Sequence, residues 1–524
     1  MSVKQVSENA EVDESLAALS TNVSAVRAIS SAVEGTLGPK GMDTMLVDQF
    51  GGVVITNDGV TILNLMEVNH PAAKMLINIA KAQQEEIGDG TTTATIMAGS
   101  LVSAGMEQVL KGVPVAKVVE GLRLGVQEGL DFFQLQAKKI KDLKDPSLKQ
   151  IALVAGRGYA EIAELVVNAA NLIGQEKLLE PHFKLAETVI AQAGAQNEVF
   201  EGVIINKEWM NAEVEADYIT NVNLLIIDDA LEPEEVEEEA LATEAGVRRY
   251  YELQNEFIHN LGKIIDLQVK LVLVDRGVSP LAEEILTDAG IVVLQRVAHK
   301  ELRKAMEHCG ARFIKRTGLK KESTELKKYL GKAQTIYLDQ KLKQVRIIDG
   351  CGKPTASILV GAATEEVVDE MERIAKDAAS AVQAAVKGGI VPGGGAVEIA
   401  AALAVQNSRQ KAKGMAAYGV DCVVEALNKP FCQIVANAGY MALEKQQEVI
   451  TAQKSQENIA LALDCETGEI TDMFELGVVD PALVKIHALK AAGEVAEAIL
   501  RIDTIIRMKE INPSQETKAG NIEF

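Results

Sequence analysis

Short apolar runs typical of β-strands are concentrated in the middle of this chain, and this placement constrains the fold more than any other feature. Between about residues 200 and 350 they alternate with helical stretches, the pattern of an α/β domain. The runs are EGVIINKE, NLLIIDD, KLVLVDRG, GIVVLQR and ARFIKR. Both ends of the chain instead show the apolar spacing of amphipathic helices. Because 524 residues exceed what one hydrophobic core serves, we predict an α/β domain inserted into a helical domain formed by both chain ends.

The N-terminal part of the chain predicts helices joined by glycine-containing turns. Residues 13–34 have helical apolar spacing, and Gly35 follows as a stop signal. The runs TMLVD and VVIT around QFGG predict a β-hairpin, and the NDG after them predicts a tight turn. Further helices are predicted over residues 70–87 and from about 91 to 110, with more between about 115 and 175. The sequence GDG of residues 88–90 therefore joins two helices.

Two later segments are also predicted to be helical. The acidic stretch of residues 231–265 favours charged helix over strand. Residues 364–387 form a long helical pattern that leads into GGIVPGGGAVE, after which we expect helices apart from a turn-rich stretch at DCETGEITDM.

The stretch GDGTTT has the composition of a metal–phosphate site. A helix N-terminus offers unpaired backbone N–H groups and a positive dipole end, and threonine hydroxyls in the first turn add donors. Asp89 at the same place would repel a bare phosphate, but it suits a Mg²⁺ ion that bridges carboxylate and phosphate oxygens. The alternative is an ordinary interhelix turn capped by an aspartate.

Two more glycine-rich loops favour a nucleotide. TLGPKG offers backbone N–H groups with Lys40 nearby, and the GGG of residues 393–395 would admit a sugar or a planar ring, or else a close helix crossing. No Walker or Rossmann motif is present. Asp58 and Asp377 are the carboxylates best placed in the sequence to orient an attacking water. For Asp377 the alternative is a solvated ion pair with Arg373.

Composition excludes several classes of protein. The net charge of −22 argues against nucleic acid as a partner, because phosphate backbones require basic patches. Five scattered cysteines without a CxxC pair indicate free thiols in a reducing compartment, and the dispersed histidines do not predict a zinc site. The polar, acidic N-terminus and the lack of a long apolar span predict a cytoplasmic protein with no membrane partner.

Five motifs together resemble the chaperonins, in order and spacing, over nearly the whole chain. They are TLGPKGMD, ITNDGVTIL, GDGTTTAT, IAKDAASAVQAAVKGGIVPGGGAVE and GVVDPALVK. The resemblance implies an ATP-driven double-ring chaperone that encloses non-native polypeptides and promotes their folding. It implies a multidomain α and α/β fold: a helical equatorial ATP-binding domain (1–135 and 389–524), a small α/β intermediate hinge domain (136–200 and 351–388) and an apical α/β substrate-binding domain (201–350).

The same resemblance implies a role for individual residues. Asp89 would bind Mg²⁺ that bridges the ATP phosphates, and Asp58 and Asp377 would position and activate the attacking water. The predicted nucleotide contacts are Leu37, Gly38, Pro39, Asp89, Gly90, Thr91, Thr92, Thr93, Gly394, Gly395 and Asp480, with Asp480 accepting ribose hydroxyls. A K⁺ ion beside the phosphates is also implied.

The chain departs from the family pattern at two places. In VAGRGYAE, Arg157 stands where related chaperonins carry a phosphate-sensing lysine, and we predict that it contacts the γ-phosphate because guanidinium binds phosphate in a bidentate manner. Ala462-Leu463-Asp464 replaces the usual Gly-x-Asn, so base contacts there are not predicted.

The segment 231–265 resembles the helical protrusion that forms the built-in lid of group II chaperonins, so no separate lid protein is expected. The expected partners are identical subunits, eight in each ring, and unfolded polypeptides. Two other functions remain open at this point: a small-molecule kinase or ATPase that uses the same non-P-loop site, and a non-enzymatic scaffold whose glycine turns only serve packing.

Overall fold

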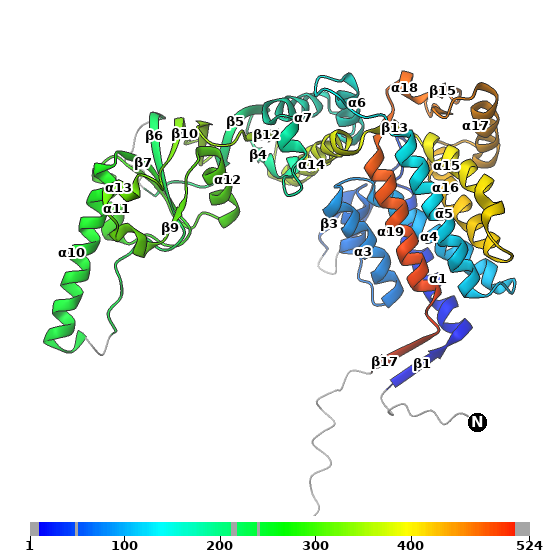
Figure 1. Ribbon diagram of the computed structural model, residues 1–524, viewed down its shortest axis with the longest axis horizontal. Helices are drawn as coiled ribbons and strands as arrows, with labels where there is room; N and C mark the ends of the chain where they lie inside the picture. Colours follow the sequence, from blue (N-terminus) through cyan, green and yellow to red (C-terminus); the bar gives the residue numbers. More distant parts are fainter. Residues whose placement is uncertain (1–9, 48–50, 211–216, 238–240, 509–524) are drawn as a thin grey trace, which may run out of the picture. The chain divides into compact units, whose positions relative to one another are not determined.

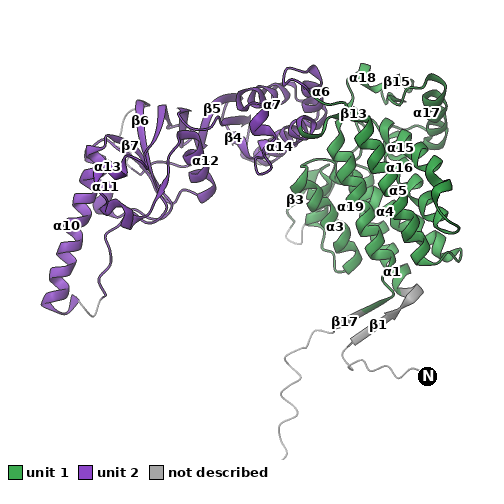
Figure 2. Cartoon of the chain, in the orientation of Figure 1, with its two compact units in different colours: residues 1–140, 387–524 green, residues 141–386 purple. Residues whose placement is uncertain are grey.

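The computed structural model describes residues 10–47, 51–210, 217–237 and 241–508. These residues form two compact units, and the first one contains both chain ends (Figures 1 and 2). Unit 1 comprises residues 1–140 and 387–524, and unit 2 comprises residues 141–386. The predicted fold class, a helical part built from both ends with an inserted α/β part, is confirmed. The finer division into three domains stays a prediction.

Unit 1 is mainly helical. Its helices are α1 (Ser15–Glu34), α2 (Gly59–Leu65), α3 (Pro71–Glu86), α4 (Thr91–Leu110), α5 (Val115–Gln136), α15 (Ala396–Ser408), η3 (Arg409–Lys411), α16 (Ala416–Asn437), α17 (Ala442–Gln456), α18 (Met473–Leu476) and α19 (Ala482–Leu500). Four antiparallel pairs complete it: β1 (Ala10–Glu14) with β17 (Thr504–Met508), β2 (Thr44–Val47) with β3 (Val53–Thr56), β13 (Ile390–Pro392) with β16 (Val479–Pro481), and β14 (Leu461–Leu463) with β15 (Ile470–Asp472).

The core of unit 1 lies between α1, α3, α4, α5, α16 and α19, and it combines leucine, isoleucine and valine side chains with alanines. At the α5–α16 crossing, a Cβ on Gly121 would lie 1.9 Å from the carbonyl oxygen of Ala416. Only glycine allows the two backbones to approach this far. Gly121 therefore allows the close crossing of α5 and α16.

Unit 2 is built on a sheet whose strand order is β4-β12-β5-β11-β10-β6-β7-β8, with β9 also pairing with β6. The strands are β4 (Val189–Ala193), β5 (Glu198–Ile205), β6 (Tyr218–Ile227), β7 (Val269–Val274), β8 (Val292–Leu294), β9 (Phe313–Ile314), β10 (Gly331–Asp339), β11 (Gln344–Gly350) and β12 (Ala356–Ala362). The helices are α6 (Pro146–Ala155), α7 (Ala160–Ile173), α8 (Gln175–Leu178), η1 (Leu185–Thr188), α10 (Glu244–Asp266), α11 (Pro280–Asp288), α12 (His299–Cys309), η2 (Arg316–Lys320), α13 (Ser323–Leu326) and α14 (Glu365–Gly388), which ends in unit 1.

Alternate residues of the central strands of unit 2 point to opposite faces of the sheet. On β6, Leu224 and Ile226 join the core that contains α12, whereas Leu225 and Ile227 join the core beneath α10 and α11. Burial of both faces explains why this segment is a continuous apolar run in the sequence.

Most predicted elements are confirmed, and three predictions need correction. The NDG turn is instead the start of α2, because the Asp58 side chain caps that helix. Within 231–265, α10 begins only at Glu244, after the cap Thr243; residues 231–237 contain no helix, and 238–240 lie outside the described residues. The C-terminal segment is not purely helical, since β13 pairs with β16 and β14 pairs with β15.

Candidate functional site

The GDG loop joins α3 to α4, as predicted, and the backbone and packing at its last glycine exclude a larger residue. Gly90 has φ of 77°, and a Cβ there would lie 2.4 Å from Cγ1 of Val484. Gly90, the N-cap of α4, has no side chain that could cap the helix. The start of α4 therefore presents backbone N–H groups, the positive end of the helix dipole and the buried threonines Thr91 and Thr93.

Asp89 carries a carboxylate whose ionised form is disfavoured. Its Oδ1 accepts a 2.6 Å hydrogen bond from the N–H of Gly90. Surrounding protein atoms strip water from the carboxylate and raise its pKa to about 6, and the negative charge of Asp480 adds to this shift. The Asp58 carboxylate acts in the same direction, while Lys485 acts against it. A divalent cation placed here would relieve the accumulated negative charge, so these residues fit Mg²⁺.

Asp58 lies in a loop that packs against the start of α4. Its Oδ2 accepts hydrogen bonds from the N–H of Thr61 at 2.9 Å and from Oγ1 of Thr61 at 2.6 Å, which fixes the carboxylate orientation. A Cβ on the next residue, Gly59, would lie 2.5 Å from Oγ1 of Thr92. The NDG and GDGTTT motifs are therefore neighbours in the folded chain.

The GGG loop follows β13, which pairs with β16 so that Val391 lies opposite Asp480. A Cβ on Gly393 would lie 3.2 Å from Oδ1 of Asp480, so this glycine leaves the carboxylate uncovered on that side. Gly395 has φ of 81°, and a Cβ there would lie 2.7 Å from Cβ of Phe431. Close packing, the alternative role for these glycines, therefore does apply to Gly395.

The TLGPKG loop is held by α16, the same helix that supports the GGG loop. Asn437 donates hydrogen bonds to the carbonyl oxygens of Glu34 at 2.9 Å and Leu37 at 2.8 Å. Gly38, with φ of 87°, approaches Ile434, which lies one turn from Phe431 on α16. Lys40 forms a 2.6 Å ion pair with the exposed Glu466.

Buried polar residues that the sequence analysis did not single out hold these loops together. The Gln83 amide donates to the carbonyl oxygens of Asp89 at 2.7 Å and Val484 at 3.3 Å. The Lys485 ammonium lies 2.6 Å from Oδ2 of Asp480 and 2.7 Å from Oε1 of Glu398. Lys485 and Glu398 end two of the quoted motifs, and the signal that could have identified them is a charged residue within an apolar helical pattern.

Arg157 and Asp377 belong to unit 2. Arg157 follows α6 with φ of 53°, and its Nη1 contacts Oε1 of Glu370 at 2.5 Å. Asp377 is partly buried on α14, two turns after Glu370. Arg373, the expected partner of Asp377 in the alternative interpretation, also contacts Glu370.

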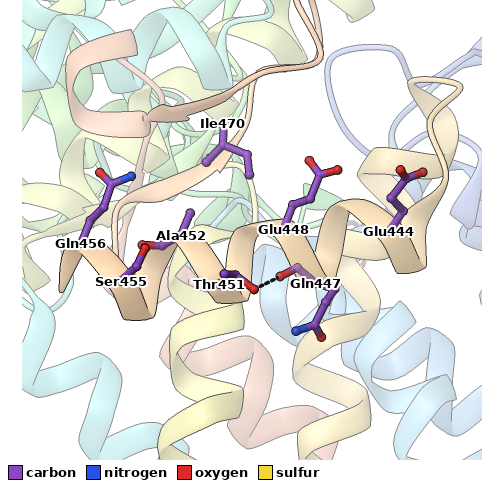
Figure 3. Close-up of a pocket in the computed structure, with 8 residues that line it drawn as sticks. All are labelled: Glu444, Gln447, Glu448, Thr451, Ala452, Ser455, Gln456 and Ile470. Atoms are coloured by element: carbon purple, nitrogen blue, oxygen red, sulfur yellow. Dashed lines mark hydrogen bonds between the residues drawn. The ribbon is translucent and has the colours of Figure 1, made fainter.

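A surface hollow of about 650 Å³ lies along α17, and it contains none of the predicted nucleotide residues (Figure 3). Its lining consists of Glu444, Gln447, Glu448, Thr451, Ala452, Ser455, Gln456 and Ile470. The Thr451 hydroxyl donates a hydrogen bond of 2.8 Å to the carbonyl oxygen of Gln447 (Figure 3).

Comparison with known proteins identifies the class. Residues 29–510 match the family model described as the TCP-1/cpn60 chaperonin family. The chain therefore belongs to this family, and it is an ATP-dependent molecular chaperone. The predicted resemblance to chaperonins is confirmed, and the comparisons give no support to the kinase alternative.

Individual chaperonin sequences and a solved structure are similar to this chain over most of its length. A thermosome subunit of Pyrococcus abyssi is 32% identical over 95% of this chain and 92% of its own length. The thermosome subunit beta of Archaeoglobus fulgidus is 34% identical over 93% of this chain and 91% of its own. A crystal structure described as a group III chaperonin in the open state is similar with a TM-score of 0.86 and 47% identity, covering 94% of this chain and 99% of that one. Among the described residues, no helix is long and apolar enough to cross a membrane; the cytoplasmic location stays a prediction.

Proposed function

We propose that this chain hydrolyses Mg-ATP at the loops of unit 1 and that the reaction closes a chamber around non-native polypeptides. The observation that carries the proposal is the convergence of separate motifs in unit 1. Gly59 meets Thr92, Asp58 and Asp480 both act on the pKa of Asp89, and α16 supports both outer glycine loops. If the glycine turns served only helix packing, nothing would require the carboxylates of Asp58, Asp89 and Asp480 to lie together beside the N-terminus of α4.

Each residue then has a physical task. The N-terminus of α4, with Gly90, Thr91, Thr92 and Thr93, would bind phosphate oxygens. Asp89 would hold Mg²⁺, which when bound would supply positive charge against the negative charge of the phosphates during hydrolysis.

The ribose and the water would be held by other groups. Asp480 would accept ribose hydroxyls, with Gly394 and Gly395 beneath the nucleotide and Leu37, Gly38 and Pro39 along its side. Asp58 and Asp377 would orient the attacking water and accept its proton. The K⁺ ion beside the phosphates stays a prediction.

Because Asp377 and Arg157 lie in unit 2, we propose that movement of unit 2 couples hydrolysis to closure. The Arg157 guanidinium would exchange its contact with Glu370 for the γ-phosphate. Arg157→Ala should then slow ATP-driven closure, with Glu370→Ala as the matched variant that keeps the guanidinium. If Arg157→Ala leaves closure and turnover unchanged, Arg157 has no role at the phosphate.

Self-association is supported by the β2–β3 hairpin, which exposes apolar side chains on a two-stranded sheet. Met45 is 61% exposed and Ile55 is 56% exposed. An exposed apolar strand edge favours pairing with another chain, and we propose identical subunits in a double ring, eight to each ring.

Client binding is proposed for the segment 231–265 of unit 2, which would also form the built-in lid. Its helix α10 exposes Tyr250 and Tyr251 among charged residues, and Tyr251 is 63% exposed. Aromatic side chains of this kind bind apolar segments of unfolded polypeptides at low entropic cost.

The test combines particle imaging with Asp377→Ala. The protein should form a particle of many subunits that closes with ATP. The variant should bind Mg-ATP within about threefold of the parent protein but turn it over at least about 100-fold more slowly, because a positioned base contributes this much. Normal turnover in the variant would remove Asp377 from the mechanism, and a monomer stimulated by a metabolite would favour the kinase alternative.

A further inference from the structure

Lys485 carries a buried positive charge at a position where burial and the helix dipole both disfavour one. The residue is 7% exposed and lies near the N-terminus of α19, at the positive end of the helix dipole. Burial alone would favour the neutral amine. The carboxylates of Asp480 and Glu398 outweigh this and raise the lysine pKa, so Lys485 stays charged.

Glu398 is an equally unusual partner. It is 1% exposed and lies in the first turn of α15, directly after the GGG loop. Among the described residues, neither of its oxygens has a hydrogen-bond donor beyond the 2.7 Å ion pair with Lys485. A buried ion pair of this kind rarely stabilises a fold more than apolar residues of the same size would.

The pair joins the two segments proposed for the ribose, the GGG loop and the strand β16 that contains Asp480. Glu398 extends from the GGG loop, and Lys485 extends from the helix that follows Asp480. The ammonium contacts Oδ2 of Asp480 at 2.6 Å, while the missing side chain of Gly393 leaves Oδ1 uncovered on one side. One Asp480 oxygen is thus anchored within the protein, and the other remains for a ligand.

We propose that Lys485 is a positioning residue that orients the Asp480 carboxylate toward the ribose hydroxyls of the nucleotide, with Glu398 as the buried counter-charge that keeps the ammonium stable in the interior. This inference rests on the proposed nucleotide site. It adds that selectivity for a ribose depends on a residue that does not touch the sugar.

The experiment compares binding of Mg-ATP and Mg-2′,3′-dideoxy-ATP by calorimetry. The assembled protein should prefer ATP by about tenfold or more, since hydrogen bonds to a charged group are worth this much. Lys485→Met and the charge-reduced Lys485→Met/Glu398→Gln should lose the preference to about twofold, with dideoxy-ATP affinity within about threefold of the parent protein. The double variant is included because the single one leaves the buried Glu398 and the partly buried Asp480 without a cation.

Glu398→Gln is the matched control. It keeps the lysine beside Asp480, so it should retain the ribose preference within about threefold while lowering thermal stability. Equal weakening of both nucleotides in the folded double variant, or an unchanged preference, would overturn the positioning role. If the parent protein itself does not distinguish the two nucleotides, the ribose contact of Asp480 is wrong, and the inference fails with it.

Discussion

Asp89 and Asp480 are neighbouring carboxylates in the same candidate site, but the charges around them differ. Asp480 has a built-in cation, because the Lys485 ammonium lies 2.6 Å away. Asp89 accepts a hydrogen bond from the N–H of Gly90 and is weakly favoured in its ionised form by Lys485, but burial and Asp480 raise its pKa to about 6. In the proposed site, the difference fits a phosphate end that receives an external cation at Asp89 and a ribose end where Lys485 already balances the charge of Asp480.

The largest expected effect follows from removing the Asp89 carboxylate, the proposed metal ligand. Asp89→Asn should lower Mg-ATP hydrolysis by at least about 100-fold, because charge on the transferring phosphoryl group would lose its metal. Steady-state phosphate release measures this. Asp480→Asn is the matched variant and should act mainly on nucleotide affinity; an equal loss of turnover in both variants would break the distinction between the two ends.

The second effect is on the pH dependence of Mg-ATP binding. Asp89 must be ionised to hold the metal, so affinity should fall about tenfold for each pH unit below about 6 and level off above about 7. The charged groups that act on its pKa are Asp58 before α2, Asp480 in β16 and Lys485 in α19. Calorimetric titrations of the parent protein and of Asp89→Asn separate this dependence from the titration of ATP itself. Parallel pH profiles in the two proteins would contradict the assignment.

The smallest effect is on stability without ligand. The folded pKa of Asp89 lies above its ordinary value near 4, so its ionisation costs stability as pH rises from about 4 to about 6 and the cost persists above 6. Asp89→Asn should therefore raise the nucleotide- and magnesium-free stability at pH 7.5 by about 1–3 kcal/mol. Thermal unfolding measures the gain, which should vanish near pH 4. A variant less stable than the parent protein at pH 7.5 would show that the carboxylate is already satisfied.

Local signals predicted the parts of the fold that local chemistry decides. Pro71 and Thr91 begin their helices as expected, because the first turn of a helix tolerates proline and glycine precedes the second helix. The start of α2 was missed because an aspartate followed by glycine is also a common turn signal, and only the hydrogen bonds to Thr61 decide for a helix cap. The pairing of β13 with β16 was missed because short strands pair with partners far along the chain.

By itself, the sequence determined the chaperonin family, the insertion of an α/β part between two helical ends, and the residue types that can bind a metal-bound phosphate. These properties depend on patterns within short segments and on their order. Only the tertiary structure decided that Lys485 and Glu398 meet, that Asp480 has a cation beside it whereas the pKa of Asp89 is raised, and that α16 supports two separate glycine loops. The reason is physical, because burial and the field of neighbouring charges depend on the distance between atoms. Segments hundreds of residues apart in the sequence come to lie at a fixed distance only when the chain folds.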